Sequence, residues 1–75
     1  MDIEARLRKL ESHYRTALSA AVAAKAHYLA LAGEPSATPA AVERASALWK
    51  QLESRKRTLA AQMGELEALD DVNAS

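Results

Sequence analysis

The sequence predicts an all-α protein, an antiparallel two-helix hairpin of the coiled-coil type that dimerises into a four-helix bundle. Three observations support this fold class. Apolar residues follow a 4-3-4-3 spacing from residue 3 to residue 31, one turn-forming segment follows at 33–38, and a second apolar stripe with seven-residue spacing comes after it. Spacings that average about 3.5 residues keep a stripe on one face of a supercoiled helix, so each stripe requires a partner helix.

The short chain limits how such a hairpin can be stabilised. Its 75 residues allow a single domain, 1–75, with a thin core, and the absence of cysteine excludes disulfides and thiolate metal sites. Oligomerisation or a partner protein is the remaining device. Ten basic and ten acidic side chains balance each other, which disfavours non-specific binding to nucleic acids or to membranes.

No segment is typical of secretion or membrane insertion. The N-terminus carries Asp2 and Glu4 and lacks an early apolar block. The most apolar run, 17–32, contains Lys25 and is too short and too polar to span a membrane. We therefore expect a soluble protein of the cytoplasm with no membrane partner.

The first helix is predicted over 2–32. Asp2 and Glu4 place carboxylates in its first turn, where they interact favourably with the helix dipole. Gly33, followed by Pro35, ends it. Its apolar stripe is expected to face the second helix and consists of Ile3, Leu7, Leu10, Tyr14, Ala17, Ala21, Ala24, Tyr28 and Leu31.

The turn at 33–38 leads into a second helix, predicted over 39–70 with a frayed tail at 71–75. Thr38 and Pro39 fit an N-cap followed by proline at the first helical position. The stripe of this helix repeats every seven residues at Ala45, Leu52, Leu59 and Leu66. Two rows flank the stripe, one with Val42, Trp49, Lys56 and Met63 and the other with Leu48, Arg55, Gln62 and Leu69.

Placing Leu31 opposite Val42 sets the register of the hairpin. Small residues then face large ones, as a packed core requires, with Tyr28 opposite Ala45, Ala24 opposite Trp49 and Ala21 opposite Leu52. The same register places Arg6 near Glu67 and Arg8 near Glu65. The predicted seam between the helices comprises Leu10, Tyr14, Ala21, Ala24, Tyr28, Trp49, Leu52, Leu59, Met63 and Leu66.

One hairpin does not cover every apolar residue of this pattern. A face wider than one partner helix can cover implies a further contact. Two hairpins that associate as a homodimer form the simplest closed arrangement, and a partner helical protein is the alternative. The predicted interface comprises Leu18, Val22 and Leu29 beside the first stripe, and Leu48 and Leu69 beside the second.

The sequence offers no catalytic, cofactor-binding or metal-binding residues. His13 and His27 lie about 21 Å apart along one helix at 1.5 Å per residue, too far to bind one metal within a chain. The histidine and glutamate spacings of zinc and di-iron bundles are absent. No nucleophile–base pair or glycine-rich phosphate loop is present, so we predict a non-enzymatic protein without a small-molecule substrate.

Two features have a functional and a structural interpretation, and the structural one is favoured for both. The basic run Arg55-Lys56-Arg57 could contact RNA, or it could form a solvated face on which Lys56 covers Ala17 and Glu53 pairs with Arg57. Trp49 could anchor a partner protein, or it could pack in the seam.

The layout resembles two families of helical hairpins. The opening Ile3-Glu4-x-x-Leu7, the chain length, the alanine-rich first helix and the glycine-containing turn resemble small co-chaperones of type III secretion needle subunits. That resemblance implies that the hairpin binds a second chaperone through its apolar stripe. The alanine and leucine layers resemble plasmid RNA-binding hairpins typified by Rop, which implies a dimeric bundle. In that family a basic and aromatic face of the first helix contacts RNA, whereas Arg8, Arg15 and His27 are scattered here.

The predicted function is that of a protein–protein interaction module, a small hairpin that self-associates or captures a partner helix. A co-chaperone of a bacterial secretion apparatus is one alternative. A Rop-like RNA-binding dimer is the alternative from a different functional class, although nucleic acid is the disfavoured partner.

Overall fold

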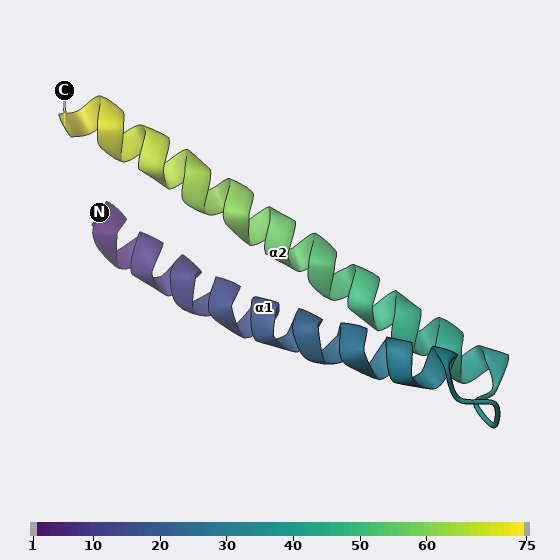
Figure 1. Ribbon diagram of the computed structural model, residues 1–75. Coiled ribbons are helices and arrows are strands. Elements are labelled where there is room, and N and C mark those ends of the chain that lie inside the picture. Colours follow the sequence, from purple (N-terminus) through teal and green to yellow (C-terminus); the bar gives the residue numbers. More distant parts are fainter. Residues whose placement is uncertain (1, 75) are drawn as a thin grey trace.

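Two long helices make up the part of the protein that the structure describes. The computed structural model describes residues 2–74 and contains α1 (Ile3–Ala32) and α2 (Pro39–Ala74), which lie side by side in antiparallel orientation (Figure 1). The molecule is a rod with principal extents of 59 × 15 × 14 Å. The prediction of an all-helical hairpin is confirmed.

Local hydrogen bonds define both ends of α1. Asp2 is the N-cap, and its carboxylate accepts a hydrogen bond from the backbone N–H of Glu4 at 3.0 Å. At the other end, the Gly33 N–H donates to the Leu29 carbonyl at 3.2 Å. Gly33 has a φ of −89°, so the helix ends without the left-handed residue that commonly occupies this position.

Thr38 begins α2 as the sequence pattern suggests. Its hydroxyl accepts a hydrogen bond from the Ala41 N–H at 3.2 Å, and its carbonyl accepts one from the Val42 N–H at 3.1 Å. Pro39 then occupies the first helical position, where a backbone N–H would have no partner within the helix.

The second helix is longer than predicted. It continues through Ala74, four residues past the expected end at residue 70, and Ser75 lies outside the described residues. No glycine or proline interrupts 65–74, so the backbone can continue the helical hydrogen-bonding pattern. The C-terminal end of α2 therefore projects past the start of α1 (Figure 1).

The core lies between the two helices and consists mainly of small residues. The buried side chains are Ala17, Ala21, Ala24, Ala45 and Leu59. All the remaining members of the first helical stripe are half-buried. Alanine lets the helix backbones approach closely, but it removes little apolar area per residue from water, so the hairpin has the thin core expected from its length.

Candidate functional site

The two rows that flank the α2 stripe have different environments. Val42, Trp49, Lys56 and Met63 are half-buried, whereas Leu48, Arg55, Gln62 and Leu69 are exposed. The Trp49 row therefore faces α1 and the Leu48 row faces outward. All ten residues of the predicted seam are buried or half-buried.

Trp49 is the centre of an aromatic cluster that joins the two helices. Its ring stacks on Tyr28 with centroids 5.6 Å apart and planes inclined by 25°, and the ammonium of Lys25 lies 5.7 Å from the Trp49 centroid. The sequence register placed Tyr28 and Trp49 in neighbouring layers and did not predict this contact. Helical side chains lean toward the N-terminus of their own helix, so in antiparallel helices they can close the gap between neighbouring layers.

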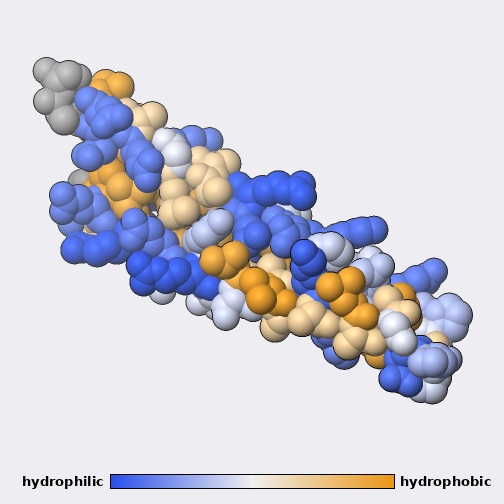
Figure 2. All heavy atoms as spheres, in the orientation of Figure 1, coloured by the Kyte–Doolittle hydropathy of each residue, from blue (hydrophilic) through white to orange (hydrophobic). Residues whose placement is uncertain are grey.

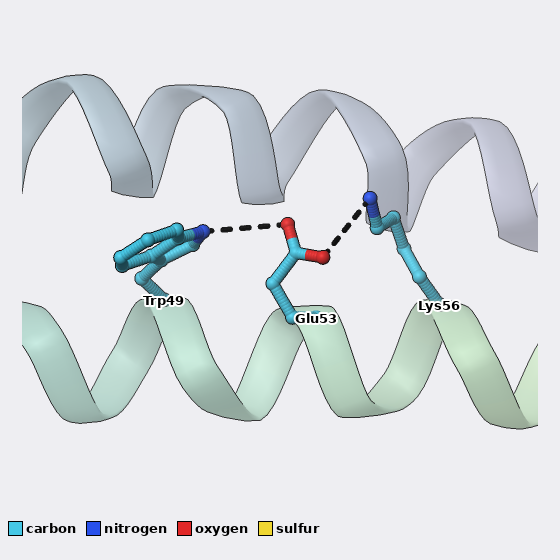
Figure 3. A network of polar contacts seen from close by, with 3 residues as sticks. All are labelled: Trp49, Glu53 and Lys56. Carbon is cyan, nitrogen blue, oxygen red and sulfur yellow. Dashed lines mark hydrogen bonds and ion pairs between the residues drawn. The ribbon is translucent and has the colours of Figure 1, made fainter.

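Glu53 links Trp49 to Lys56 along α2, on the side that faces α1 (Figure 3). The indole Nε1–H of Trp49 donates to Oε1 of Glu53 at 3.3 Å, and Nζ of Lys56 lies 3.2 Å from Oε2. The hydrogen bond from Lys56 is the main cause that lowers the pKa of the Glu53 carboxyl. The hydrogen bond from Trp49 and the charge of Arg57 act in the same direction, whereas partial burial opposes them.

These contacts correct the predicted charge pairs. Glu53 forms its ion pair with Lys56 and not with Arg57, because Lys56 shares the inward row with Trp49 while Arg57 is exposed. The basic run is therefore divided, with Lys56 turned inward.

The pairs expected between the helix ends are absent as well. Within the described residues, no ion pair joins Arg6 to Glu67 or Arg8 to Glu65. All four side chains are exposed, and exposed pairs gain little free energy from a fixed geometry.

The five residues of the predicted interface are all exposed, but they do not lie on one side of the hairpin. Leu18 precedes Lys25 by seven residues, so both lie on the edge of α1 that borders Trp49. Leu48 lies on the opposite edge of α2 from Trp49. A sequence pattern fixes a stripe on its own helix, but it does not fix the side of the hairpin on which that stripe lies.

We call Leu18, Val22 and Leu29 the α1 edge, and we call the row Leu48, Arg55, Gln62 and Leu69 the α2 edge. Val22 and Leu29 are 62% and 56% exposed, and Leu48 and Leu69 are 49% and 54% exposed. Val72, which lies in the segment 71–75 predicted to fray, is helical and 71% exposed, and it follows Leu69 by three residues on the same side of α2.

The surface view shows how the apolar side chains are distributed on one face. In Figure 2, separate apolar patches lie over the central and turn-proximal parts of the rod and near the end at which the two termini lie, with hydrophilic side chains between them. The patches are discontinuous, a distribution that suits a row of side-chain contacts with another helix better than a deep binding pocket.

The surface also has two shallow, open depressions, and no residue of either edge lines them. One is lined by Trp49, Lys50, Glu53 and Arg57, and the other by Arg6, Lys9, Leu10 and His13. Neither of them brings a nucleophile together with a general base. Within the described part of the chain, no three histidine, aspartate or glutamate side chains are grouped to bind a metal, and neither helix could cross a membrane.

The fold and its exposed edges define a class, a short helical hairpin with unpartnered apolar residues on two sides. Comparisons with protein-family models, with curated proteins and with solved structures find no match for this chain.

Proposed function

We propose that this chain is a non-enzymatic protein–protein interaction module that binds helices, either those of a second copy or a helix of another protein. The observation that carries the proposal is the exposure of all five apolar side chains of the predicted interface, on a hairpin whose core is mainly alanine. Leu18, at 38%, is the least exposed of the five.

The energetics favour such a partner. Fully burying an exposed leucine or valine side chain contributes roughly 1.5–3 kcal/mol. These five are already about half covered within the hairpin, so burying the remainder would contribute roughly half of that amount for each. Docked helices would bury these residues at the usual helical spacing of three, four and seven. The alanine-rich core gives the isolated hairpin little apolar burial of its own.

Sedimentation equilibrium at tens of micromolar tests the self-associating form of this proposal. We expect a dimer, together with a melting temperature that rises with protein concentration. A folded monomer whose melting temperature is independent of concentration would contradict self-association and leave capture of a partner helix. Salt-sensitive binding of mixed RNA, lost in an Arg55→Ala/Arg57→Ala variant, would instead support the RNA-binding alternative.

A further inference from the structure

We infer that the α2 edge docks a second copy of this chain in antiparallel orientation, about a two-fold axis that passes between Thr58 and Leu59. The inference rests on the proposed function, because it names the surface through which the interaction module associates with itself. The α1 edge then remains available for the helix of a different protein.

The residue order on the α2 edge is the first argument. Leu48, Arg55, Gln62 and Leu69 are exposed and recur every seven residues, in the order apolar, polar, polar, apolar. This order of residue classes is the same in both directions along the helix. An antiparallel copy centred between Thr58 and Leu59 therefore places Leu48 against the partner's Leu69 at both ends of the contact.

The polar residues at the centre match as well. The same axis places Arg55 opposite the partner's Gln62, and the amide oxygen of a glutamine can accept a hydrogen bond from a guanidinium. In the adjacent exposed row, Gln51 lies near the level of the partner's Glu65, and the two copies of Thr58 meet at the axis. Polar pairs inside an apolar contact fix its register and orientation.

The charge distribution along α2 is the second, independent argument. Residues 44–57 contain five basic side chains and one acidic one, whereas residues 60–74 contain four acidic side chains and no basic one. Neither Glu65 nor Glu67 forms an ion pair with another described residue. An antiparallel second copy places the basic half of each α2 beside the acidic half of the other, whereas a parallel copy would place like charges together.

The α1 edge lacks this symmetry. Its three apolar residues all lie in the half of α1 nearer the turn, and Lys25 lies among them. An antiparallel copy that placed Leu18 against the partner's Leu29 would place Val22 against the partner's Lys25. Of the two edges, the α2 edge is therefore the one that complements itself.

A single engineered cysteine tests the position of the axis, because the chain has none of its own. The hydroxyl of Thr58 bonds to the Ser54 carbonyl of its own helix, so Thr58→Cys removes no contact between the helices. Under mild oxidation, Thr58→Cys is expected to form a disulfide-linked dimer. Gln62→Cys is the matched control, since the two-fold axis separates its copies by about 10 Å along the helix, beyond the reach of a disulfide.

Exchanging charges tests the orientation. Arg44→Glu/Arg55→Glu removes the basic charges from the α2 edge and from the adjacent exposed row that contains Gln51 and Glu65, and Gln62→Lys/Glu65→Lys makes the same two rows more basic. Each variant alone is expected to self-associate at least about tenfold more weakly than the parent, and an equimolar mixture is expected to restore association. Circular dichroism of each variant verifies that the helices are retained.

The outcomes separate this inference from the proposed function. Two results would overturn the assignment to the α2 edge. In the first, Gln62→Cys cross-links the dimer and Thr58→Cys does not. In the second, Leu18→Glu/Val22→Glu dissociates the dimer and Leu48→Glu/Leu69→Glu leaves it intact. The module would still self-associate in both cases. A strictly monomeric parent would overturn the inference and leave only the capture of a partner helix.

Discussion

Glu53 is the residue on which the polar contacts of the inner face depend. Its carboxylate accepts the indole N–H of Trp49 and pairs with Lys56, so it holds both side chains on the side of α2 that faces α1. Lys56 thereby occupies an inward position without an unpaired charge. The heptad spacing predicts Lys56 in the inward row, but it does not identify the carboxylate that accompanies Lys56 there.

The lowered pKa of Glu53 makes a prediction about pH. Because this pKa is lower in the folded chain than in the unfolded chain, its stabilising effect is present above the ordinary glutamate pKa and is lost as the pH falls through the lowered value. Glu53→Gln should therefore lower the melting temperature at neutral pH, and the variant and parent should converge in acid.

Thermal melts followed by circular dichroism across the acidic range measure this difference. The matched control is Glu43→Gln, which removes an exposed carboxylate of α2 that forms no ion pair with another described residue. A gap between parent and Glu53→Gln that stays constant from neutral to acidic pH would show that the ion pair is not its source.

At the scale of the elements, the glycine that follows α1 and the glycine inside α2 have different roles. Gly64 lies inside α2, is exposed, and has no atom within 4 Å of the position that a Cβ would occupy. Gly64→Ala should stabilise the protein by about 0.5–1 kcal/mol, because alanine has less backbone freedom to lose on folding and a higher helix propensity. For a chain of this size, that corresponds to a rise in melting temperature of a few degrees.

Gly33→Ala serves as the comparison in the same thermal melts. Gly33 has a negative φ, and a Cβ there would lie 3.6 Å from the Leu29 carbonyl oxygen, an ordinary contact. We expect a change smaller than that of Gly64→Ala. A loss of about 1 kcal/mol at Gly33 would instead indicate a left-handed helix end.

The sequence predicted the helices better than it predicted the contacts between them. All nine positions of the α1 stripe that the heptad spacing identified are buried or half-buried, because periodicity depends only on the geometry of one helix; Ala20, outside the stripe, is half-buried as well. The Tyr28–Trp49 stack and the Glu53–Lys56 pair depend on rotamers and on the lean of side chains, which spacing does not determine. The division of Leu18 and Leu48 between two edges depends on how one helix is rotated against the other.

At the scale of the whole molecule, introducing glutamate should have different consequences in the buried core and on the exposed α1 edge. Ala21 is 1% exposed, so Ala21→Glu introduces a charge between the helices and should destabilise the hairpin by about 3 kcal/mol or more. Leu18→Glu/Val22→Glu changes only the α1 edge and should leave the isolated hairpin helical. Far-UV circular dichroism at low protein concentration distinguishes the two variants, and equal loss of helix in both would place Leu18 and Val22 in the hairpin core.

The short connection at residues 33–38 also bears on how the chain folds. Residues near the turn are close in sequence as well as in space, whereas the pairs at the open end are separated by almost the whole chain. Closing a short loop loses less entropy than closing a long one. The contacts between α1 and α2 should therefore form first beside the turn and then progressively toward the open end. Trp49, which contacts Tyr28 in the half nearer the turn, would then change its fluorescence before the open end of the hairpin has closed.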